Sequence, residues 1–95
     1  MFNNQRYANK GITNTVPLVT QIILWDCLDS MKVELKDYLQ VFKLVANGSN
    51  QQVMHSQEEP TYERTFTFPT DEPITAKIFV IDDETHTTML LAEEY

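Results

Sequence analysis

The C-terminal part of the chain carries the pattern that most restricts its fold. Two β-prone runs, Ile74–Ile81 and Thr87–Ala92, flank a polar, acidic connection, Asp82–His86. Such runs on either side of a short polar segment are typical of a β-hairpin. The first run is apolar on both faces, although Lys77 interrupts the face that carries Phe79. A strand of this kind needs cover on both sides, so we predict that it lies centrally in a sheet.

The one convincing helical pattern extends from Pro17 to Leu35. At about 100° per residue, one broad apolar face gathers Leu18, Ile22, Leu24, Trp25, Leu28, Met31 and Leu35. We therefore predict one long helix that rests this face on the sheet. A second apolar stripe on its outward side contains Val19, Ile23 and Cys27. We expect that stripe to be covered by a loop, a terminal strand or another subunit.

Three further β-prone runs lie between the helix and the hairpin: Tyr38–Val45, Gln51–Gln57 and Tyr62–Phe68. Short connections between them, including the Asn-Gly pair at 47–48, predict antiparallel pairing. Residues 1–95 are expected to form a single two-layer α+β domain, in the order strand, helix, then five strands. The opening segment Gln5–Ile12 is mildly β-prone, and the sequence leaves open whether it joins the main sheet.

The charge and the cysteine content exclude several classes of function. A net charge of −7 opposes binding to a nucleic acid backbone or to an anionic membrane surface. Cys27 is the sole cysteine, which rules out an intramolecular disulfide. The first 15 residues contain no apolar signal core, and purely aliphatic or aromatic runs reach only four residues. We expect a cytoplasmic, soluble protein.

Three segments resemble a known family: the opening Met1–Tyr7, the stretch Asp37–Phe42, and Ala76–Asp83 together with Met89–Tyr95. They are similar to segments of small acidic proteins of unknown function from Gram-positive bacteria (staphylococci, enterococci and their relatives). The resemblance spans essentially the whole chain and brings no catalytic residues with it. It implies a cystatin-like or nuclear-transport-factor-like fold, with a helix cradled by a curved antiparallel sheet of five to six strands.

The acidic connection is the one candidate for a metal site. The side chains of Asp82, Asp83, Glu84 and His86 are of types that bind divalent cations. The calcium-loop pattern with its central glycine is absent. A solvated hairpin turn, in which an Asp side chain accepts backbone N–H groups, explains the same residues. We favour the turn and expect neither a metal nor a cofactor.

Other reactive side chains have ordinary structural explanations. His55 lies in a polar run and would need a substrate within hydrogen-bond reach to act as a base. Cys27 lies within the predicted helix, where a free thiol is typically a small buried apolar residue. Aromatic residues could line a pocket between helix and sheet, but we interpret them as core: Trp25, Tyr62, Phe66 and Phe68.

Three functions are compatible with these observations. The first, which we favour, is a non-enzymatic protein that acts through protein contact and forms a homodimer. The second is a small-ligand binder or a hydrolase-like enzyme with a pocket at the end of the helix–sheet layer, formed by His55, Asp82 and Asp83. The third is an acidic mimic of nucleic acid, motivated by the net charge alone.

Overall fold

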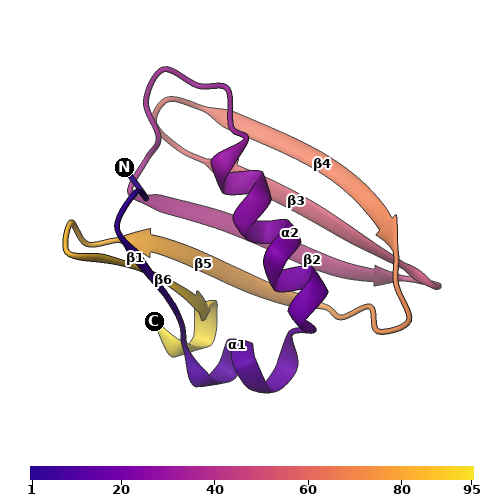
Figure 1. The fold of residues 1–95 in the computed structure, drawn as a ribbon. Helices are drawn as coiled ribbons and strands as arrows, with labels where there is room; N and C mark the ends of the chain where they lie inside the picture. The colour runs from indigo at the N-terminus through magenta and orange to yellow at the C-terminus, as the bar shows by residue number, and fades with distance from the viewer.

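The chain folds into a six-stranded sheet with two α-helices on one side, as a computed structural model of residues 1–95 describes (Figure 1). The strands are β1 (Gln5–Ala8), β2 (Leu39–Asn47), β3 (Asn50–Gln57), β4 (Tyr62–Pro69), β5 (Ala76–Asp82) and β6 (His86–Leu91). The helices are α1 (Lys10–Thr15) and α2 (Leu18–Asp29), and a short 3-10 helix, η1 (Ala92–Glu94), ends the chain. This arrangement confirms the expected α+β class.

The strands lie in the order β1-β6-β5-β2-β3-β4, and the sheet is open at β1 and β4. All neighbouring strands are antiparallel except β1, which runs parallel to β6. The opening segment therefore joins the sheet through Gln5–Ala8, and the remainder of Gln5–Ile12 leads into α1. The central place expected for the strand at Ile74–Ile81 is confirmed, because β5 lies between β2 and β6. The likeness to the cystatin group stays a prediction.

The first tight hairpin forms where the sequence places its strongest turn signal. Asn47 pairs with Asn50 at the end of the β2–β3 ladder, and Gly48 has a φ of 62°. That left-handed conformation is free of steric cost for glycine, which is why the Asn-Gly pair closes a short turn here. The turn aligns β2 and β3 over seven residue pairs, from Val41–Ser56 to Asn47–Asn50.

The prediction of one helix over Pro17–Leu35 was wrong at its C-terminal end. Helix α2 ends at Asp29, and the Ser30 hydroxyl donates a hydrogen bond to the Cys27 carbonyl at 3.4 Å. Short polar side chains compete in this way with helical hydrogen bonds and favour helix ends. The chain then leaves the helix, and Met31 turns into the core. A second helix, α1, precedes Pro17 and was not predicted.

The buried side of α2 also differs from the predicted one. Leu24, Leu28 and Met31 are in the core as expected, but Leu18, Ile22 and Leu35 are exposed. The predicted second stripe is not one surface, since Cys27 is buried, Ile23 packs against the core and Val19 is exposed. Apolar residues occur on all sides of α2, so their spacing does not select one face. The packing of α2 against the sheet and α1 selects it.

Helix α2 covers one face of the sheet, which we call the inner face (Figure 1). A cluster of 13 buried apolar residues fills the space between them, with Phe42 and Ile78 from the sheet and Leu24 and Leu28 from α2. The molecule measures 36 × 26 × 20 Å, and the shortest dimension accommodates these two layers. None of the helices has the length and apolar character required to cross a bilayer.

Candidate functional site

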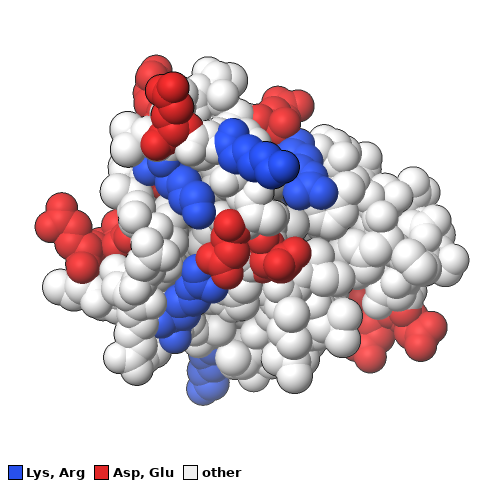
Figure 2. Space-filling view, turned by 45° about the horizontal axis from the view of Figure 1, so that its top comes forward, with Lys and Arg blue, Asp and Glu red and all other residues white.

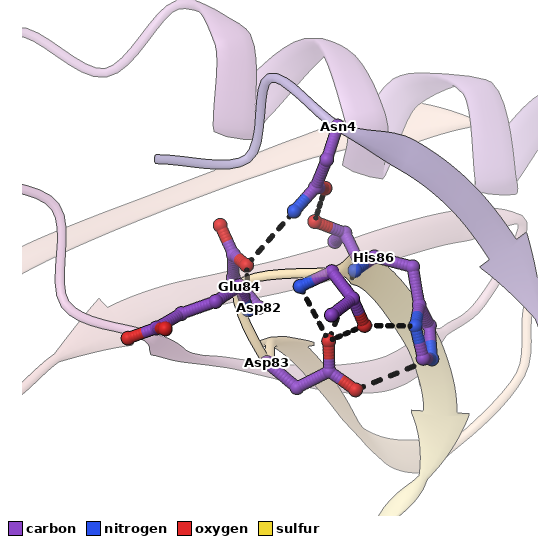
Figure 3. A network of polar contacts seen from close by, with 7 residues as sticks. Asn4, Asp82, Asp83, Glu84 and His86 are labelled. Carbon is purple, nitrogen blue, oxygen red and sulfur yellow. Dashed lines mark hydrogen bonds and ion pairs between the residues drawn. The ribbon is translucent and has the colours of Figure 1, made fainter.

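The acidic connection forms the turn between β5 and β6, where Asp83 acts as the local anchor (Figure 3). One carboxylate oxygen accepts the backbone N–H groups of Thr85 and His86 at 3.0 and 2.9 Å, and the Thr85 hydroxyl at 2.8 Å. The other oxygen lies 3.4 Å from His86 Nε2. The hydrogen bonds from His86 N–H and the Thr85 side chain lower the pKa of Asp83 below its usual value. Asp83 thus stabilises the turn as an ionised acceptor.

Asp82 points the other way and holds the N-terminal segment. Its carboxylate accepts the backbone N–H of Phe2 at 2.7 Å, the Asn4 side-chain amide at 3.0 Å and the Glu84 backbone N–H at 2.7 Å. Burial alone raises the pKa of Asp82, but these three hydrogen bonds together bring it below its ordinary value. The buried Phe2 side chain is thereby fixed in the core. This role of Asp82 was missed, since no local pattern connects residues 80 positions apart.

The four metal candidates do not converge on one point. Asp82 faces Asn4, Asp83 faces His86, and Glu84 extends away from both (Figure 3). No group of three His, Cys, Asp or Glu side chains in the structure has an arrangement that could hold a metal ion. The donor atoms of Asp82 and Asp83 are instead engaged by protein N–H and O–H groups. The geometry thus matches the hairpin-turn interpretation.

His55 lies on the inner face of β3, fully buried, and belongs to a chain of polar side chains. Its ring stacks on Phe42 with centroids 4.2 Å apart and meets the edge of Tyr62 at 5.3 Å. Its Nε2 lies 2.7 Å from Gln40 Oε1, and Gln40 Nε2 donates to Gln57 Oε1, also at 2.7 Å. Since the Gln40 oxygen is the free acceptor, the proton of neutral His55 is on Nε2. Nδ1 has no hydrogen-bond partner.

Neither His55 nor Cys27 has the environment of a reactive group. Burial, followed by the charges of Arg64 and Lys36, lowers the pKa of His55 to about 4. Burial raises the pKa of the Cys27 thiol to about 11, so the nucleophilic thiolate is strongly disfavoured. Both side chains are closed off from solvent, where a substrate would have to approach. The three groups of the proposed pocket make separate sets of contacts, with His55 on β3, Asp82 at the end of β5 and Asp83 in the following turn.

The aromatic residues considered as pocket lining lie at the margin of the core. Tyr62, Phe66 and Phe68 project from the inner face of the edge strand β4 and pack against the core cluster. Trp25 packs there too, and its ring lies 4.9 Å below the Arg6 guanidinium. Arg6 also forms a two-armed ion pair with Asp29, which connects β1 to the end of α2. These contacts give the aromatic residues a structural role.

The face of the sheet opposite α2, which we call the outer face, carries apolar residues that neither α-helix covers. Four of them, Leu39, Val41, Phe79 and Ile81, are half-buried, and Leu90 is buried. Leu39 lies opposite Ile81, Val41 opposite Phe79, and Phe79 opposite Leu90. These five residues form a continuous surface across β2, β5 and β6, which we call the outer patch. Tyr95 meets the Phe79 ring edge-on at 5.7 Å and remains 78% exposed at its border. A contiguous apolar surface of this kind is a mark of an interaction site.

Charges border the outer patch at both ends. Beyond Val41 and Phe79, two exposed lysines, Lys43 and Lys77, lie directly opposite each other. At the other end, a hollow of about 160 Å³ has Leu39 and Val41 in its wall, next to Asp37 and Glu58 (not drawn in the figures). The sequence predicted the two-faced strand and the position of Lys77 on it. It did not predict that Lys43 lies opposite Lys77, because that contact depends on strand register.

Charges elsewhere are mixed. On the face shown in Figure 2, acidic residues lie in separate small groups with Lys and Arg between them. A mimic of nucleic acid would need carboxylates in rows that follow the spacing of phosphates. The distribution on this face does not have that form.

Comparison with known proteins places the chain among proteins of similar fold. A solved structure described as a protein of unknown function from Enterococcus faecalis is similar over 98% of this chain and 92% of its own, with a TM-score of 0.83 and 26% identity. None of the curated proteins matches. The family described as Staphylococcal protein of unknown function (DUF960) matches residues 5–94. The chain therefore belongs to the DUF960 family.

Proposed function

We propose that the protein works in the cytoplasm by binding another protein through its outer patch, and that it has no enzymatic activity of its own. The observation that carries the proposal is the apolar surface that the half-buried side chains of Leu39, Val41, Phe79 and Ile81 form beside Leu90 on the face opposite α2. On a sheet that faces water, such positions are usually polar, since alternation places apolar residues only on the covered face.

The environments of the reactive side chains support the second half of the proposal. The lowered pKa of His55, the raised pKa of Cys27 and the occupied oxygens of Asp82 are the properties of groups that stabilise a fold. A single buried thiol is also compatible with a reducing compartment such as the cytoplasm.

Photo-cross-linking in the native host tests the proposal. A benzophenone amino acid at position 79 samples the outer patch, and the same group at position 22 samples the exposed side of α2. Ile22 is the matched control because it is an apolar residue, 57% exposed, on the opposite side of the molecule. We expect protein adducts from position 79 and few from position 22. Absence of adducts from position 79, or equal yields from both positions, would contradict the proposal.

A further inference from the structure

We infer that the occupant of the outer patch is a second copy of this chain, packed sheet against sheet with its strands antiparallel to the first, so that Lys43 of each copy enters the acidic hollow of the other. This inference rests on the proposed function, because it names the partner that the outer patch binds.

The molecule is large enough to present a standard interface on one face. The two longest dimensions of the molecule are 36 and 26 Å. A molecule of these dimensions has room on one face for the roughly 800 Å² that a standard protein interface takes from each partner. The apolar centre and charged border of this face also follow the usual anatomy of an interface.

Along β2, the outward side chains change character in a fixed order. Asp37 and Glu58 border the hollow, Leu39 and Val41 form its apolar wall, and Lys43 follows. Successive outward residues on a strand are about 7 Å apart. The lysine and the acids therefore lie at opposite ends of the apolar centre.

The outward residues of β5 and of the turn after it change from lysine to apolar to acidic along the chain. Since β5 is antiparallel to β2, the acidic ends and the lysine ends of the two strands lie side by side. Asp83 lies in the turn at the acidic end, Phe79 and Ile81 are the apolar centre, and Lys77 lies opposite Lys43. No ion pair joins either lysine to an acid within the chain. Two like charges placed directly opposite each other destabilise an isolated sheet. A partner that brings carboxylates to this point would remove that cost.

Symmetry then selects between two ways of stacking the sheets. A twofold axis parallel to the strands would place the lysine pair over the lysine pair of the other copy. A twofold axis across the strands, between the Leu39–Ile81 and Val41–Phe79 rows, reverses the order of the second copy. Lys43 then lies over the hollow beside Asp37 and Glu58, and Lys77 lies over Asp83. Because the interface is isologous, each of these contacts occurs twice.

A charge-swap cycle tests this arrangement. Lys43 and Glu58 are both exposed, and neither side chain forms an ion pair within the chain. We expect K43E and E58K each to raise the dimer dissociation constant about fivefold or more, and the double variant K43E/E58K to restore most of the affinity. Sedimentation equilibrium measures the constants, and circular dichroism verifies the fold.

The single variant E58K separates the specific contact from the general effect of net charge. It lowers the magnitude of the net charge, which by itself reduces repulsion between two copies of an acidic protein. A weaker E58K dimer therefore reports loss of the specific contact. The matched control is E72K, which makes the same charge change at an exposed position in the loop between β4 and β5. It should leave the dimer unchanged or slightly tighter.

Three results would overturn the inference: a monomeric purified chain, single variants that bind as tightly as the unmodified protein, or a double variant no better than the singles. K77E tests a second contact, and we expect it to raise the dimer dissociation constant about as much as K43E does. If the purified chain is monomeric while position 79 cross-links to another protein in cells, this inference fails and the proposed function stands. If position 79 gives no adducts at all, both fail.

Discussion

Mild acid should destabilise the protein through His55. In the unfolded chain this imidazole binds a proton near its ordinary pKa of 6.5, whereas in the folded protein it does so only near pH 4. Between these values the unfolded state holds more protons, so the free energy of unfolding falls as the pH is lowered. The full shift corresponds to about 3 kcal/mol, of which about 2 kcal/mol is lost between pH 7 and pH 4.5.

Urea denaturation at several pH values between 7 and 4.5 measures this loss. The variant His55→Gln retains a donor for Gln40 but has no group that titrates in this range, so its stability should change little with pH. It will be less stable than the unmodified protein at pH 7, because the ring stacked on Phe42 is lost. The carboxylates with lowered pKa values, Asp29, Asp82 and Asp83, lose their contribution only below about pH 4.

The matched control is His86→Gln, which removes the only other histidine, at the surface of the β5–β6 turn. This variant should keep the pH dependence of the unmodified protein. If His55→Gln loses as much stability on acidification as the unmodified protein, or if His86→Gln abolishes the dependence, the account of His55 as a buried neutral residue is wrong.

Three other predictions concern single side chains. Asp82→Ala should lower the free energy of unfolding by about 2–4 kcal/mol, because it leaves the buried Phe2 N–H without its acceptor, whereas Asp83→Ala, in the exposed turn, should cost less; urea titrations of the two variants side by side would refute this ranking if the costs are equal. The Cys27 thiol should react with a thiol reagent at pH 8 at least about 100-fold more slowly in the native protein than in urea, since its pKa is raised to about 11 and its side chain is buried; comparable rates would show that the thiol is accessible. Gly11→Ala should cost about 1–3 kcal/mol, because its new methyl group would lie 2.5 Å from Oε1 of Glu94, the carboxylate whose other oxygen, Oε2, accepts the N–H of residue 11; an unchanged thermal midpoint would contradict this contact.

Local patterns in the sequence were sufficient for most of the sheet. The Asn47–Gly48 turn and the two-faced strand around Phe79 are encoded by a few neighbouring residues, and the structure confirms both. The pairing of β1 with β6 could not be predicted in the same way. It joins two short segments about 80 residues apart, and the hydrogen bonds that Phe2 and Asn4 donate to Asp82 span an equally long stretch of sequence.

The helix shows where periodicity fails. Apolar residues surround α2 almost completely, so Leu18 and Ile22 were assigned to the core although they are exposed. Packing against α1 and the sheet decides the orientation, and those contacts are not written in the spacing of residues along one helix. For the same reason the border of the outer patch was missed, because Lys43 and Lys77 become neighbours only once the register of β2 and β5 is known.

Sedimentation equilibrium of the unmodified protein, alongside Phe79→Asp and Ile22→Asp, tests the central claim most directly. The account predicts a dimer with twice the 11.1 kDa mass of one chain. A charge at position 79 should raise its dissociation constant about tenfold or more, while the exposed helix variant remains a dimer. A monomer at every concentration, or a dimer that Ile22→Asp dissociates and Phe79→Asp does not, would contradict the claim that the outer patch is where this protein binds its own copy.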